Sequence, residues 1–396
     1  MEGIISSIKV SVGSAGRFHT FDLARQLNKY NYLKKLYTAC PRFKVDGIPL
    51  DKVRTFPWFM GASFILNRLG ISFLKEYLNY FVVESFDNWV ASHLEDCDIY
   101  HCLSSFGIKS HHRAKEHFNA LTICDRGSSH ILYQDEILAE EFARWGIPYK
   151  KIDRRIIDRE IQEYEYCDLI FVPSSFAYRS FVKKGVSESK LFKIPYGVDL
   201  NLFHPVPKED NVFRIIYVGA LSLRKGIPDL LEAVCTLRLP KYEVWLIGGI
   251  MPEVISFMKK HEGHYRHLGI IPRNELYRYY SQGSVFSMAS LEDGFGLVQA
   301  QAMACGLPVI ATTNTGAEDL FTDGVEGFIT PIRNPNAIKE KVLFLYEHPE
   351  IREQMAVSAL KRVKSLGGWD TYGANIINAY KIALNKRGKN IAHSSL

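Results

Sequence analysis

The chain has 396 residues, of which 47% are hydrophobic and 23% are charged, and its formal net charge is +6. This length exceeds one ordinary hydrophobic core and favours two domains with a cleft between them, in a soluble globular protein. The most apolar run, residues 56–66, has 11 residues and contains a proline and a glycine. It is therefore well short of the roughly 20 residues needed to cross a bilayer.

The cysteines and the start of the sequence favour a cytoplasmic protein. No charged-then-apolar export signal with a small-residue cleavage site opens the sequence. The seven cysteines are odd in number and include no C-x-x-C pair, which argues against a disulfide framework or a zinc site. We therefore expect reduced, mostly buried thiols.

Basic and aromatic residues are interleaved between residues 28 and 79, where nine lysines and arginines face three acids. Such a mixture suits the anionic inner face of a membrane. It equally suits a solvated basic surface over core aromatics. The basic residues are Lys29, Lys34, Lys35, Arg42, Lys44, Lys52, Arg54, Arg68 and Lys75, and the aromatic ones include Tyr37, Phe43, Phe56, Trp58, Phe59, Phe64, Phe73 and Tyr77.

In chain order, Ile4–Ser11 reads as a first strand, followed by a glycine-bearing turn at residues 13–16 and a helix through about Leu27. Strand, glycine turn and helix form the first unit of a doubly wound α/β domain. The turn does not follow the G-x-G-x-x-G pattern, which disfavours a dehydrogenase.

Two further strands are expected at residues 98–102 and 121–125. The second ends in unlike polar groups, Asp125, Arg126 and His130 among them. Ligands of open α/β sheets gather beyond the carboxyl ends of strands, so this is where a catalytic group should project. Arg126 is expected to face either a phosphate or the Asp125 carboxylate. The D-x-D pattern at residues 96–98 lies before its strand, and we interpret it as solvated rather than as a metal motif.

A second domain is predicted after a proline-bearing linker. It opens with a strand at Phe213–Val218, a loop at residues 219–226 and a helix from about Ile227 to Leu237. The loop carries two adjacent cations, Arg224 and Lys225, which suit a diphosphate because a cation in a cleft stabilises the charge that develops on the leaving group. The alternative is that these are ordinary surface cations.

The stretch Leu291–Ile310 carries the strongest signal. Its middle, Leu297–Ala304, predicts a short helix that ends before Gly306 in a left-handed cap, and a buried strand follows. Before the helix stand Asp293 and two glycines, so the free N–H groups and the helix dipole form a ready phosphate site. Gln301 lies one turn inside this helix. The alternative is a surface turn that caps a core helix.

This stretch resembles the donor-binding segment of the retaining GT-B glycosyltransferases of family 4. That segment has an acidic residue, seven further residues, and a glutamate before an AMACG-like run. The alignment places Asp293 at the first carboxylate, which in the family contacts the transferred sugar. It places Gln301 at the second, which holds the ribose hydroxyls, and Gln still forms uncharged hydrogen bonds there. Glu292 ranks second as a stand-in for Asp293.

The resemblance also carries over residues elsewhere in the chain. A family histidine that bonds the donor sugar matches His130, and the family's lysine before a glycine matches Lys225. Ala220 replaces the usual arginine, so Arg224 is expected to supply the second cation. The expected catalytic residues are His130, Asp293, Arg224 and Lys225; the expected donor-binding residues are Gly13, Gly16, Arg126, Gly219, Ile270, Gly294, Phe295, Gly296, Leu297 and Gln301.

The resemblance implies an α/β protein of GT-B fold, with two Rossmann-like parallel-sheet domains facing each other across a cleft. The expected domains are residues 1–200 on the acceptor side, with a C-terminal helix at about 371–388 packing back on them, a linker at 201–211, and a nucleotide-sugar domain at 212–370. The implied activity is retaining, metal-independent transfer of a hexose to a saccharide or lipid-linked saccharide, in polysaccharide or glycolipid synthesis. UDP-glucose or a related UDP-sugar is expected as co-substrate, with no other cofactor and no nucleic-acid partner.

Two alternatives stay open. One is another GT-B enzyme, a nucleotide-sugar epimerase or hydrolase. The other is a catalytically silent sugar-nucleotide-binding protein, which the departures at Asp293 and Gln301 suggest. The expected location is the cytoplasm, with peripheral contact to the inner membrane face through the basic and aromatic segment.

Overall fold

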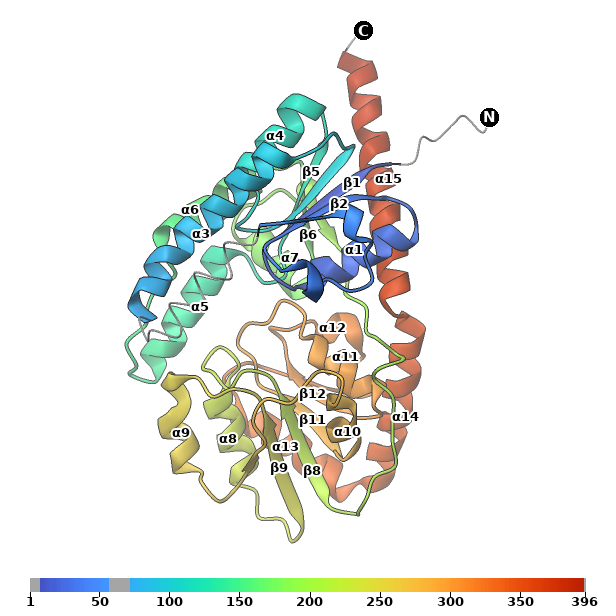
Figure 1. Cartoon of the computed structure of the whole chain (residues 1–396). Helices are drawn as coiled ribbons and strands as arrows, with labels where there is room; N and C mark the ends of the chain where they lie inside the picture. Colours follow the sequence, from blue (N-terminus) through green and yellow to red (C-terminus); the bar gives the residue numbers. More distant parts are fainter. Residues whose placement is uncertain (1–7, 57–71, 395–396) are drawn as a thin grey trace.

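A computed structural model describes residues 8–56 and 72–394, which form two α/β lobes stacked on one another (Figure 1). Each lobe contains one sheet whose paired strands all run parallel. Helices on both faces of the sheets bury runs of apolar residues, as parallel sheets require. No helix in these two ranges is both long enough and apolar enough to span a bilayer.

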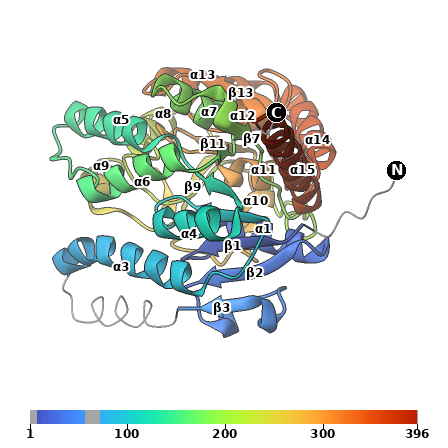
Figure 2. The same cartoon turned by 90° about the horizontal axis from the view of Figure 1, so that it is seen from above.

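The first domain is built on a sheet with the strand order β3-β2-β1-β4-β5-β6-β7. Seen from above, β3 and β2 lie toward one edge of the lobe (Figure 2). The strands are β1 Val10–Ser14, β2 Leu33–Thr38, β3 Val53–Thr55, β4 Ile99–Leu103, β5 Leu121–Asp125, β6 Leu169–Val172 and β7 Leu191–Lys193. The helices are α1 His19–Lys29, α3 Ser72–His93, α4 Ile108–Phe118, α5 Ile131–Arg144, α6 Arg154–Tyr166 and α7 Ser175–Lys183.

The first strand lies further along the chain than the sequence predicted. It begins at Val10, and Gly13 belongs to the strand rather than to the following turn. A Cβ on Gly13 would clash with the hydroxyl of Tyr100 on the neighbouring strand β4. The glycine therefore serves packing inside the sheet, and the turn into α1 is formed by residues 15–18.

The second domain is built on a sheet with the order β10-β9-β8-β11-β12-β13. Its predicted strand at residues 213–218 and helix at residues 297–304 are confirmed, and the strand expected at 309–311 extends to residue 312. The strands are β8 Phe213–Val218, β9 Tyr242–Ile247, β10 Arg266–His267, β11 Val285–Met288, β12 Val309–Thr312 and β13 Gly327–Thr330. The helices are α8 Ile227–Cys235, α9 Ile255–Lys260, α10 Leu276–Ser281, α11 Leu297–Ala304, α12 Ala317–Leu320, α13 Pro335–Glu347 and α14 Pro349–Leu366.

The last helix, α15 (Trp369–Ser394), returns to the first domain and lies along α1 (Figure 1). Its residues Ile376 and Tyr380 are buried in the same apolar cluster as Val10 and Phe21. The chain thus passes between the domains twice, and the two passages touch. A Cβ on Gly197 would lie only 2.5 Å from the carbonyl carbon of Gly368, so a side chain larger than hydrogen does not fit there.

Helix α5 of the first domain contacts the second domain at its far end. Both terminal nitrogens of Arg144 lie 2.8 Å from the carboxylate oxygens of Asp229. The Arg333 Nε of the second domain donates to the fully buried Glu141 at 2.7 Å. These charge-assisted bonds hold the two domains together on the side opposite α15.

The basic and aromatic segment lies only partly in the described residues. Phe43 is 84% exposed in a short 3-10 turn, Arg42–Lys44. The expected membrane-facing residues Trp58, Phe59, Phe64 and Arg68 fall at residues 57–71, outside the described residues.

Candidate functional site

A hollow of about 230 Å³ lies between the two domains. The first domain contributes Gly127 and Tyr196 to its wall, and the second contributes the rest. Residues from two loops far apart in the sequence meet there, the loop after β8 and the loop before α11. The wall from the second domain is formed by Tyr217, Val218, Gly219, Lys225, Met288, Asp293, Phe295, Gly296, Leu297 and Val298.

Lys225 and Asp293 form an ion pair in the wall of this hollow. The other carboxylate oxygen of Asp293 accepts a hydrogen bond from the Gly296 N–H at 3.0 Å, which caps the start of α11. Burial opposes ionisation of Asp293, but the positive charges of Lys225 and Arg224 outweigh it and hold its pKa below the ordinary value. Asp293 is thus an ionised carboxylate that holds an ammonium group at the cleft.

Helix α11 presents two free amide groups to the same hollow. Gly296, at its start, has φ +72°, a conformation that favours glycine. Among the described residues, the N–H groups of Leu297 and Val298 have no hydrogen-bond acceptor. Both residues line the hollow. Together with the positive end of the helix dipole, these amides form a site that favours an anion.

Glu292 and Arg224 form a second ion pair, at 3.0 Å, within the second domain. The Glu292 carboxylate is fully buried and accepts bonds from the Ser129 N–H at 2.9 Å and from Gln134 Nε2 at 2.8 Å. Burial alone would raise the pKa of Glu292. The charge of Arg224 and these hydrogen-bond donors outweigh that effect and hold the pKa below the ordinary value. Glu292 therefore faces the first domain, which corrects the view that it could stand in for Asp293.

Gly294 serves the contact between domains. A Cβ there would clash with the Gly127 carbonyl oxygen, and the Gly294 carbonyl accepts a bond from the Ser174 hydroxyl. Neither feature involves the hollow.

The remaining donor-binding candidates of the second domain do not all reach the hollow. Gly219, with φ +148°, lines the hollow. Gln301 is buried, and its carboxamide oxygen accepts a bond from the Tyr280 hydroxyl at 3.2 Å. Ile270 is 80% exposed, in contact range of Gly249. The structure thus brings Gly219 to Lys225 and turns the Gln301 oxygen to the core.

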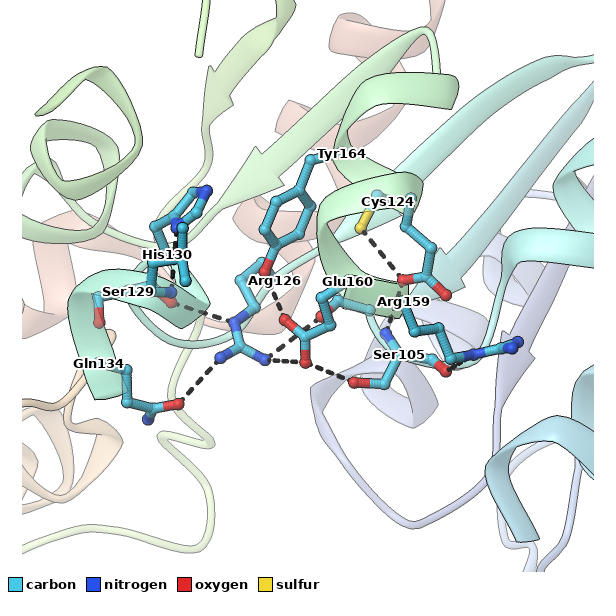
Figure 3. Close-up of polar contacts among 12 residues, drawn as sticks. Ser105, Cys124, Arg126, Ser129, His130, Gln134, Arg159, Glu160 and Tyr164 are labelled. Carbon is cyan, nitrogen blue, oxygen red and sulfur yellow. Dashed lines mark hydrogen bonds and ion pairs between the residues drawn. The ribbon is translucent and has the colours of Figure 1, made fainter. Parts of the chain in front are cut away.

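His130 lies in a different hollow from Lys225 and Asp293, which corrects the expectation that it projects into the cleft. Its Nδ1 accepts a bond from the Leu132 N–H at 3.2 Å and so caps α5. Its ring lies 5.0 Å, between centroids, from both Tyr164 and Phe181, and it points away from Gln134 (Figure 3). Burial, aided by the charges of Arg126 and Lys184, lowers its pKa to about 4.

Arg126 is bound within the first domain, and it faces neither a phosphate site nor Asp125. Its guanidinium lies 2.8 Å from a Glu160 oxygen and 3.0 Å from Gln134 Oε1 (Figure 3). Glu160 in turn accepts bonds from the hydroxyls of Ser105 and Tyr164. Arg126 therefore orders the loop after β5.

Gly13 and Gly16 do not line the hollow. Gly13 lies inside β1. A Cβ on Gly16 would come within 2.7 Å of the Phe18 ring, so this glycine permits the tight turn into α1.

Sequence reasoning missed the residues that the first domain does bring to the hollow. Tyr196 lines it, and His19 stacks on Tyr196 with ring centroids 4.3 Å apart. The signal was available in principle, since His19 follows the first strand and its turn, the place where open α/β sheets bind ligands.

Comparison with known protein families gives one match over the second domain. Residues 201–362 match the family described as "Glycosyl transferases group 1". The chain is 26% identical over 278 residues to an uncharacterized glycosyltransferase of Methanocaldococcus jannaschii, covering 65% of this chain and 71% of that protein. It is 27% identical over 224 residues to a D-inositol 3-phosphate glycosyltransferase of Kribbella flavida, covering 50% and 52%. The match thus spans about half of the Kribbella enzyme.

Solved structures with the same architecture include sucrose-phosphate synthase of Thermosynechococcus elongatus. It superposes with a TM-score of 0.72 at 20% identity, covering 96% of this chain and all of that one. HepE of Anabaena, in complex with UDP-glucose, gives 0.68 at 16% identity, covering 94% and 99%. At these identities the likeness concerns the fold: the chain has the GT-B fold that its sequence predicted.

Proposed function

We propose that this chain, whose residues 201–362 match the group 1 glycosyl transferases, moves a hexose from a nucleoside-diphosphate sugar to a saccharide or lipid-linked saccharide. One observation carries the proposal. The Lys225 ammonium and the free N–H groups of Leu297 and Val298 line one hollow between the two domains. A cation beside unpaired amides at a helix start favours a diphosphate.

The charges of the site suggest how the donor is held. Arg224 and Lys225 are each paired with a carboxylate, Glu292 and Asp293, so the four side chains carry no net charge together. We propose that the diphosphate takes the Lys225 ammonium, while Asp293 turns to a hydroxyl of the transferred sugar. Arg224 stays with Glu292 and contributes through its field. As the leaving diphosphate gains charge, these groups stabilise it, which makes a divalent metal unnecessary.

UDP-glucose is the first choice of donor. HepE, which shares the fold, has been solved with UDP-glucose, which supports testing this compound first. The exposed Ile270, beside Gly249, offers an apolar surface to a flat base. Gln301 reaches the ribose only with its NH₂ group, because its oxygen is bonded to Tyr280.

Retention of configuration is proposed from the resemblance to family 4. We expect the glycosidic bond of the product to have the same anomeric form as the donor. NMR of the isolated product decides this, and an inverted bond refutes retention while leaving the transfer itself intact.

Peripheral membrane contact is proposed for the face around Phe43. This ring is exposed between Arg42 and Lys44, and an apolar group flanked by cations suits an anionic bilayer surface. Flotation with liposomes should recover more protein on anionic than on neutral lipid, and equal recovery would contradict the proposal.

The test of function is titration followed by turnover. Calorimetry with UDP, GDP and UDP-glucose should show binding to the wild-type chain. UDP-glucose consumption should then require an added acceptor, for which octyl glycosides of glucose, galactose and mannose are soluble probes. Consumption without acceptor would favour a hydrolase or epimerase, and tight binding without any turnover would favour a silent sugar-nucleotide-binding protein.

A further inference from the structure

A chain of buried hydrogen bonds runs from the C-terminal helix to the wall of the hollow. The Tyr380 hydroxyl lies 2.7 Å from Nδ1 of His101. Nε2 of His101 lies 2.9 Å from Oδ2 of Asp125, and Nε2 of His19 lies 2.8 Å from the same oxygen. The side chains of all four residues are less than a tenth exposed. The Tyr196 hydroxyl, in the wall of the hollow, lies 3.2 Å from Nε2 of His19.

The partners fix where the protons of His19 lie. Burial opposes ionisation of Asp125, but His19 and His101 outweigh it and hold its pKa well below the ordinary value. Because Asp125 is an ionised carboxylate that accepts, each histidine donates to it through an Nε2–H group. The proton of a neutral His19 is therefore on Nε2, and its Nδ1 carries a lone pair. Among residues 8–56 and 72–394, no group donates to this Nδ1.

The Cε1–Nδ1 edge of the His19 ring lies beside Gly127. A Cβ built on Gly127 would lie 3.6 Å from His19 Nδ1 and 3.1 Å from the Tyr196 hydroxyl. Gly127 and Tyr196 both line the hollow between the domains. His19 therefore lies directly behind the part of the wall that the first domain supplies, and Gly127 leaves room beside it because it has no side chain.

We propose that His19 binds and orients the acceptor: its Nδ1 accepts a hydrogen bond from the acceptor hydroxyl that attacks the sugar. Asp125 is a positioning residue, since it fixes the tautomer and the ring orientation of His19. The inference rests on the proposed function. It also assigns His19 the role on the first domain that was expected for His130.

The two histidines on Asp125 differ in their surroundings. Both ring nitrogens of His101 have partners, Tyr380 and Asp125. Nδ1 of His19 has no partner among the described residues, and it is not one of the described polar atoms that are sealed from solvent. A ligand hydroxyl can therefore reach this nitrogen.

The test uses His19→Gln. The Gln amide nitrogen can replace Nε2 and keep the bond to Asp125, while the acceptor at Nδ1 is removed. The matched control is His101→Gln, which alters the other histidine on the same carboxylate oxygen. We measure kcat and KM for the octyl glycoside that the wild type uses best, the Kd of UDP by calorimetry, and Tm.

For His19→Gln we expect kcat/KM for the acceptor to fall about 100-fold, as for misplacement of a reacting group, with the UDP Kd within about twofold of the wild type. For His101→Gln we expect a lower Tm and an acceptor kcat/KM that falls far less. The inference is overturned if His19→Gln keeps its acceptor kcat/KM, or if UDP binding weakens in parallel. If the proposed function itself is wrong, the wild type will show no turnover with any acceptor.

Discussion

Removal of the Lys225 ammonium tests the donor site most directly. In Lys225→Met the diphosphate loses a charge-assisted hydrogen bond, a loss of about 1.5–3 kcal/mol, or roughly 10- to 100-fold in the Kd of UDP. The same change leaves the Asp293 carboxylate without its partner. Both side chains of this pair are less than one-fifth exposed, so the variant should also be less stable, by up to about 3 kcal/mol.

The double variant Lys225→Met/Asp293→Asn separates these two effects. It has no unpaired carboxylate, so its unfolding free energy in urea should recover toward that of the wild type. Its affinity for UDP should stay low, because the ammonium that binds the diphosphate is still absent. Calorimetry and urea unfolding are measured on the same samples.

The matched control is Lys184→Met. Lys184 also forms an ion pair, with Glu136, but it lines a different hollow. The UDP affinity of this variant should equal that of the wild type. If the double variant binds UDP within threefold of the wild type, Lys225 does not contact the diphosphate and the proposed donor site is refuted.

Three further predictions concern the domain contact and pH. Gly294→Ala should weaken turnover more than UDP binding, because its Cβ would clash with the Gly127 carbonyl and push the domains apart; equal losses in both assays would contradict this. Arg333→Ala should lower the unfolding free energy by about 1.5 kcal/mol, since the buried Glu141 loses one charge-assisted bond and keeps those from Arg144 and Trp145, and an unchanged urea midpoint would refute it. The pKa of His130 is lowered to about 4, so the unfolded chain binds a proton more readily, and stability should fall by about 2 kcal/mol between pH 7.5 and 5. His130→Asn should remove that part of the pH dependence.

The sequence was most informative where structure is decided locally. Leu297–Ala304 forms the predicted helix, Gly306 has the expected positive φ of +79°, and β8 has the predicted bounds. Helix formers, a glycine after the last turn and a β-branched run decide these features within a few residues. The resemblance of the stretch Leu291–Ile310 to family 4 implied the GT-B fold.

Side-chain direction could not be read in the same way. Glu292 and Asp293 are adjacent, yet one faces Ser129 of the other domain and the other faces Lys225. His130 was placed by its distance from β5, but the backbone at the start of α5 turns its Nδ1 onto the Leu132 N–H. The direction of Glu292 depends on contacts with residues more than a hundred positions away, and that of His130 depends on the first turn of a helix. Neither leaves a pattern in composition or spacing.

The crossing of the chain at Gly197 and Gly368 has a mechanical consequence. The two passages touch on one side of the molecule and form a hinge, so the lobes would open by rotating about that line. Displacement then grows with distance from this line, so it separates Arg144 from Asp229, which meet on the side opposite α15. The distance between fluorescent labels at Arg144 and Asp229 would change when the lobes open, whereas the distance between labels beside Gly197 and Gly368 would barely change.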